Sequence, residues 1–176
     1  MMATVNDRAR SIATFRYVSV WLMETSARWT PTTPEMEAKV MFGRHIWDYA
    51  QMADSLGRRT FELRQAEHYT LRPAEAYEAL LEMVRAARST SERIDALYAG
   101  VIPGLIDRYR RYLAATDPVL DEPSIVIIER ILRELERQGA EAAALKCELG
   151  LGALSAPRIA TREQDVGEIV ADRAET

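Results

Sequence analysis

The sequence predicts an all-α protein built as an antiparallel four-helix bundle. Apolar residues recur every three to four positions through most of the chain, and no stretch alternates as a β-strand does. Prolines and polar turn residues divide this pattern into four long segments, which favours a bundle. A chain of 176 residues is long enough for one domain with a sizeable core. We therefore expect a bundle over residues 1–149, followed by a polar C-terminal tail over 150–176.

The first predicted helix covers residues 6–29. Phe15 and Leu22 belong to one apolar face, while Tyr17 and Trp21 make the opposite side apolar too. A helix that is apolar nearly all round is buried on several sides. One side fits the bundle interior, so the surplus predicts a homodimer, or another homo-oligomer, that forms through this helix.

The second predicted helix starts near Pro34 and runs to about residue 67. Glu35 and Glu37 favour this start, because acidic side chains stabilise the positive end of a helix. Residues 73–112 carry a third helical pattern, with a break or a new cap at 89–92 and a kink at the Pro-Gly pair that follows residue 102. The fourth helix covers about 122–149.

Composition excludes several classes of function. The net charge is −4, and acidic residues are interleaved with the arginines, so no nucleic-acid surface is expected. No apolar run approaches the length of a membrane span, and the short run 17–23 lacks the features of a signal peptide. Cys147 is the single cysteine, which excludes an internal disulfide and suits a reducing compartment. We expect a cytoplasmic protein that has no nucleic-acid or membrane partner.

Two segments, GRHIWDYAQMADSLGRRTFELR (43–64) and DPVLDEPSIVIIERILRELERQ (117–138), resemble the ferritin-like superfamily. The resemblance extends over most of residues 10–149. It implies a bundle in which two helices each supply a Glu and two others each supply Glu-x-x-His to a di-iron site that oxidises or oxygenates a substrate.

The positions that match these ligands have lost them. Asp48 and Gln51 stand for Glu-x-x-His on the second helix, and Leu135 and Gln138 stand for it on the fourth. Neither pair contains a histidine, and leucine cannot bind a metal. No metal cofactor is therefore expected, and the site is predicted to be degenerate. On a helical wheel Asp48 and Gln51 fall on the polar side, which predicts contact with solvent.

His45 and Glu24 are the candidate catalytic residues. His45 lies at the edge of the apolar stripe, and Glu24 is the only acid on an almost uncharged part of its helix. A carboxylate taken out of water needs a partner or keeps its proton, so Glu24 is a candidate acid, base or ligand. The alternatives are a hydrogen-bonded packing role for His45 and an arginine partner at the rim for Glu24.

Two functions remain open from the sequence. In the first, a bundle without the usual di-iron ligands is a binding or assembly module, with a possible small-molecule ligand. In the second, the bundle is an oxidase or oxygenase that holds iron through Glu24, Glu37, His45 and Glu82 or Asp95, or that works without metal. Six aromatic residues could line a ligand pocket or simply build the core: Trp21, Trp47, Tyr77, Tyr98, Tyr109 and Tyr112.

Overall fold

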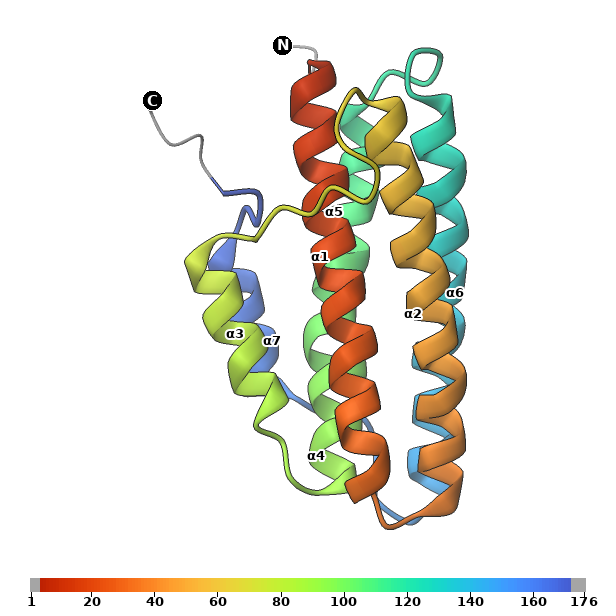
Figure 1. The fold of residues 1–176 in the computed structure, drawn as a ribbon. Coiled ribbons are helices and arrows are strands. Elements are labelled where there is room, and N and C mark those ends of the chain that lie inside the picture. Colours follow the sequence, from red (N-terminus) through yellow and green to blue (C-terminus); the bar gives the residue numbers. More distant parts are fainter. Residues whose placement is uncertain (1–3, 172–176) are drawn as a thin grey trace.

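The computed structural model describes residues 4–171 and is all-α over that range (Figure 1). It contains α1 (Val5–Trp29), α2 (Met36–Glu62), α3 (Glu75–Arg85), α4 (Thr90–Asp95), α5 (Ile102–Ala115), α6 (Glu122–Glu148) and α7 (Pro157–Val166), with a 3₁₀ turn η1 (Thr30–Thr32) and a π-helical stretch η2 (Ala96–Val101). The predicted first, second and fourth helices are present as α1, α2 and α6, although α2 ends at Glu62 and not near residue 67 as expected. Between residues 4 and 171, no helix combines the length and the apolar character that a membrane crossing requires.

The long helices lie side by side. The chain runs in one direction along α1 and α6, and in the other direction along α2 and the continuous segment α4–η2–α5 (Figure 1). The link between α2 and α4 therefore crosses the length of the molecule, and it contains α3. The new cap expected at 89–92 is present as a capping box: the Ser89 hydroxyl accepts from Glu92 N–H and the Glu92 carboxylate accepts from Ser89 N–H. It divides the third helical pattern into α3 and the separate segment α4–η2–α5.

The second apolar side of α1 is covered by α3. Tyr17 donates a hydrogen bond of 2.9 Å to the Glu78 carboxylate, and the Arg85 guanidinium lies 5.5 Å from the centre of the Trp21 ring. Trp29 Nε1 also donates to the Arg85 carbonyl oxygen. The surplus apolar surface that predicted self-association through α1 is thus buried within the chain. Self-association through α1 remains a prediction, but the surplus apolar surface no longer supports it.

The kink predicted near Pro103 is a widened helical turn. Pro103 has no N–H to bond a carbonyl one turn earlier, and its ring crowds that carbonyl. The preceding residues adopt π-helical bonding, and Ile102 N–H bonds Leu97 O, five residues back. The helix continues through α5, as expected from the apolar rhythm.

Helix α7 packs against η2 and α5 at two glycines. A Cβ atom on Gly100 would overlap the Ile159 side chain, and one on Gly104 would overlap the Glu163 carboxyl group. Arg108 then forms a buried ion pair with Glu163 and donates a hydrogen bond of 3.1 Å to the Gly167 carbonyl oxygen. The tail was expected either to cover the bundle or to stay free. Its residues 157–171 cover α3 and α5, whereas 172–176 lie outside the described residues.

Candidate functional site

The acidic residues predicted as ligands lie on the surface of different helices. Glu24, Glu37 and Glu82 are exposed on α1, α2 and α3, and no hydrogen bond or ion pair joins Glu24 to His45. Asp95 is paired with Lys146 at 2.6 Å. Among residues 4–171 no three His, Cys, Asp or Glu side chains are grouped as a metal site requires.

His45 is fully buried and connects two helices to α2. Its Nδ1 lies 2.6 Å from the Tyr98 hydroxyl of η2, and its Nε2 lies 3.2 Å from Glu141 Oε2 on α6. An ionised carboxylate can only accept, so Nε2 carries the proton and donates to Glu141. Nδ1 then accepts from Tyr98 O–H. Both ring nitrogens are occupied, and neither is left for a metal.

Burial and the neighbouring charges keep Tyr98, His45 and Glu141 in one protonation state. Burial lowers the pKa of His45, more than the Glu141 carboxylate raises it. Burial opposes ionisation of Glu141, but the bond from His45 and the charges of Arg44 and Arg137 together lower its pKa. Burial also raises the pKa of Tyr98 well above its ordinary value. At neutral pH the phenol and the imidazole are therefore neutral and the carboxylate is ionised.

Two of the positions that match the lost ligands, Asp48 and Gln138, bond each other across the α2–α6 contact. Gln138 is fully buried and its Nε2 donates to Asp48 at 3.0 Å, while Arg137 pairs with Asp48 at 2.7 Å. Asp48 and Gln51 are half-buried, so they are less exposed than a polar helix face predicts. Together with the His45 network, these bonds occupy the polar interior between α2, η2 and α6. The arrangement is closed and leaves no room for a substrate at Tyr98, which is only 4% exposed.

Sequence reasoning missed Glu141, the carboxylate that bonds His45. Its signal was its position: it follows Gln138 by three residues, at the boundary of the apolar stripe of α6. It also missed Asp121, a fully buried carboxylate that accepts from Arg59, Ser124, Tyr112 and Thr116. Asp121 stands in a turn before α6, where acidic residues are ordinary, so no pattern marked it.

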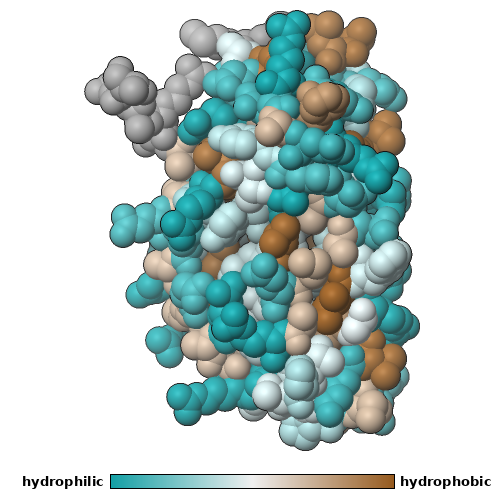
Figure 2. All heavy atoms as spheres, in the orientation of Figure 1, coloured by the Kyte–Doolittle hydropathy of each residue, from teal (hydrophilic) through white to brown (hydrophobic). Residues whose placement is uncertain are grey.

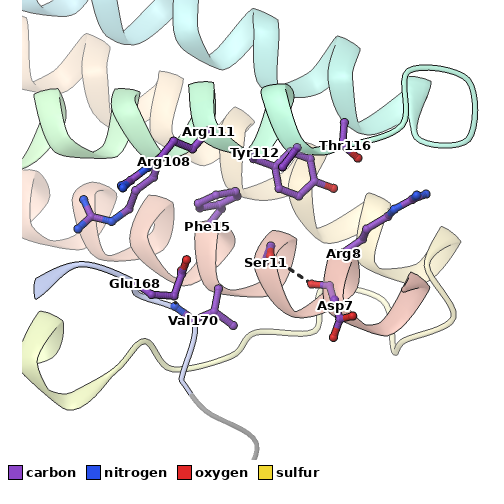
Figure 3. Close-up of a pocket in the computed structure, with 11 residues that line it drawn as sticks. Asp7, Arg8, Ser11, Phe15, Arg108, Arg111, Tyr112, Thr116, Glu168 and Val170 are labelled. Carbon is purple, nitrogen blue, oxygen red and sulfur yellow. Dashed lines mark hydrogen bonds between the residues drawn. The ribbon is translucent and has the colours of Figure 1, made fainter. Parts of the chain in front are cut away.

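A cavity of about 270 Å³ lies between α1, α5 and the C-terminal segment (Figure 3). The rings of Phe15 and Tyr112 pack against each other edge to face, with centres 5.9 Å apart, and both line the cavity. Glu168 and Val170 form the wall that the C-terminal segment contributes. Of the six aromatic residues considered as pocket-lining from the sequence, Tyr112 lines this cavity. Tyr77, Tyr98, Tyr109 and Trp21 are in the core, and Trp47 is exposed on α2.

Two arginines that line the cavity, Arg8 and Arg111, form no ion pair within residues 4–171, although Arg8 lies close enough to Asp117 for their charges to interact. Arg8 is only 7% exposed, has no ion pair within residues 4–171, and has a buried Nε without a hydrogen-bond partner. Its closest recorded acceptor is the Leu120 carbonyl oxygen, 3.5 Å from Nη1. Arg111 lines the same space without an ion pair, whereas Arg108 is paired with Glu163. Of the lining acids, Asp7 accepts from the N-cap residue of α1, and Glu168 accepts from the backbone N–H groups of the two residues that follow it.

Comparison of the chain with family models, with curated proteins and with solved structures found no match.

Proposed function

We propose that this chain is an antiparallel four-helix bundle of the ferritin-like type that works as a binding module for a small organic anion. Bundles of this type join their four helices with one long crossover. The crossover that contains α3 supports the assignment, as does the pairing of α1 and α6 in one direction with α2 and α4–η2–α5 in the other.

The single observation that carries the binding function is the buried guanidinium of Arg8, which forms no ion pair within residues 4–171 and lies beside an aromatic cavity. Burial of a charge without a partner is costly, and a carboxylate or phosphate group would supply two or more acceptors to a guanidinium. Arg111 adds a second unpaired positive charge. The Phe15 and Tyr112 rings suit an apolar or aromatic body. A cavity of roughly 150 Å³ holds a benzene ring, so the available 270 Å³ accommodates a benzoate-sized molecule.

The enzyme alternative, a ferritin-like iron oxidase or oxygenase, has less support from the arrangement of the residues. A di-metal site needs several carboxylates and imidazoles directed at one point. Here the expected carboxylates are on separate surfaces and the only buried histidine uses both nitrogens. The alternative predicts near-stoichiometric iron in protein expressed with added iron and manganese. We expect none.

Calorimetric titration with benzoate and phenyl phosphate tests the binding function. We expect saturable binding that weakens by about tenfold or more in Arg8→Gln and in Arg111→Gln, since each removes a charge-assisted hydrogen bond. Arg133→Gln, an exposed change on α6, is the matched control and should bind as the wild type does. Absence of binding, or equal binding by all four proteins, would overturn the proposal.

A further inference from the structure

Among residues 4–171, no other element covers the outward face of α2. Helix α3 covers α1 and helix α7 covers α5, on the opposite side of the molecule (Figure 1). Apolar side chains gather along the side where Figure 1 places α2 (Figure 2). Met36, Val40 and Trp47 are 64%, 53% and 66% exposed. An exposed tryptophan among other exposed apolar residues is typical of an interaction surface.

These residues form a regular seam. Met36, Val40, Gly43, Trp47 and Ala50 follow one another at alternating spacings of four and three, and we call them the α2 seam. Such spacing is that of helices that pack along each other. The core-facing stripe of α2 is a different set, which includes Phe42, Tyr49 and Leu56. Helix α2 therefore carries two packing faces, of which the chain itself uses one.

We propose that the α2 seam binds the α2 seam of a second copy of this chain, antiparallel, around a two-fold axis at Gly43. Val40 and Trp47 lie at nearly equal distances on either side of Gly43. An antiparallel crossing there brings Trp47 of each copy opposite Val40 of the other, so the two-fold axis generates this contact on both sides of Gly43. The space where a Gly43 side chain would lie is open, with no atom within 4 Å. Two helix backbones can approach closely at such a position.

The shape of the surface suits a second copy. A hollow of about 390 Å³ lies beside Met36 and Val40, with Met41 and Leu145 among its walls. The antiparallel crossing directs the exposed Trp47 ring of one copy towards this hollow in the other. Because a two-fold interface uses the same patch on both copies, each Trp47 obtains an apolar site.

The charges that lack partners are also arranged for this orientation. Glu37 and Glu148 flank the hollow at the Met36 end, and Arg130 flanks the Trp47 end. None of the three has an ion pair within residues 4–171, whereas Asp48, Glu134 and Glu141 on the same face are paired with arginines. The antiparallel arrangement places the acidic end of one copy against the basic end of the other.

Sedimentation equilibrium over a range of protein concentrations tests the proposal. The wild type should be a dimer, and Trp47→Glu should raise the dimer dissociation constant by about tenfold or more. Phe61→Glu is the matched control: Phe61 is 65% exposed on the same helix but lies beyond the stretch that overlaps with a second copy, so the dimer should persist. A monomeric wild type, or a dimer that Trp47→Glu leaves unchanged, would overturn the proposal.

Disulfide cross-linking tests the axis. In a Cys147→Ser background, Gly43→Cys places two thiols at the two-fold axis, where they should oxidise to a covalent dimer within the non-covalent one. Ala79→Cys, at an exposed position of α3, is the control and should cross-link only by random collision. Equal rates for the two variants would exclude an axis at Gly43. The interface and the anion cavity involve different helix faces, so failure of either proposal leaves the other intact.

Discussion

At the scale of single residues, the ring of His45 imposes the strictest requirements on its neighbours. It needs a donor at Nδ1 and an acceptor at Nε2, in a place that water does not reach. Tyr98 and Glu141 meet these requirements from two different helices. The three side chains therefore fix how α2, η2 and α6 lie relative to one another.

Replacing Tyr98 with phenylalanine should destabilise the protein. The change removes the hydroxyl that donates to Nδ1 and leaves a buried acceptor unpaired, which costs about 1–3 kcal/mol. Urea unfolding measures the loss. Tyr69→Phe, which removes a hydroxyl that has no hydrogen bond within residues 4–171, should change the free energy of unfolding little. A similar loss in both variants would argue against the importance of the His45 bond.

The lowered pKa of His45 predicts that acid destabilises the fold. In the unfolded chain this imidazole takes up a proton near its ordinary value of 6.5, whereas burial resists protonation in the folded protein. The unfolded state thus binds more protons below pH 6.5, and the free energy of unfolding should fall as the pH decreases from 6.5 towards the lowered pKa.

Unfolding curves recorded at several pH values check this dependence. In His45→Gln the decrease should be absent, because the amide can accept from Tyr98 and donate to Glu141 without titrating. His68→Gln, a change at an exposed position, should retain the decrease seen in the wild type. A pH dependence that survives in His45→Gln would assign it to other groups.

At the scale of helices, a glycine-to-alanine change should have opposite effects at Gly104, which lies against α7, and at Gly139, which faces open space. Gly104→Ala should displace α7, because the added methyl group meets the Glu163 carboxyl group. Gly139→Ala has open space around it, so it should stabilise α6 by about 0.5–1 kcal/mol through helix propensity. Hydrogen exchange within residues 157–166 should accelerate in the first variant only. Unchanged exchange in Gly104→Ala would contradict the tight packing of α7.

The helices themselves were predictable because their apolar periodicity is local. Residues 5–29, 36–62 and 122–148 carry it over many turns, and Pro34 and Pro123 near the starts of the second and third of these segments support the boundaries. The separate role of α3 was not predictable. The spacing of Tyr77, Leu80 and Val84 predicts an apolar helix face, but it does not indicate which other helix that face contacts. Site residues such as Glu141 depend on contacts distant in sequence, and periodicity contains no information on those partners.

At the scale of the whole molecule, Asp121 joins three elements at one end of the structure. Its carboxylate accepts from Arg59 of α2, Tyr112 of α5 and Ser124 of α6. Burial opposes its ionisation, but these hydrogen bonds together lower its pKa, so it stays ionised at neutral pH. The Asp121 carboxylate therefore links α2, α5 and α6 at the end of the molecule opposite η1.

Asp121→Ala should be the most destabilising of these changes. It leaves the Arg59 guanidinium buried with Glu62 as its only carboxylate partner, and breaking a buried pair costs about 3–5 kcal/mol. That is a large part of the roughly 5–15 kcal/mol that stabilises a typical domain. Guanidinium unfolding measures the loss. Asp54→Ala breaks an exposed pair with Arg58 and should cost less than about 1 kcal/mol. Comparable losses would contradict the role of Asp121.

Because Glu168 and Val170 form one wall of the cavity, the cavity is incomplete until this part of the chain has been synthesised. A ribosome releases the N-terminal helices first, and they can associate while the rest of the chain is still being made. Residues 168–170 emerge after all the other segments that line the cavity, and only then can Pro73 pair with Val170 and the cavity gain its final side. A nascent chain is therefore expected to bind the proposed anion only after residues 168–170 have left the ribosome.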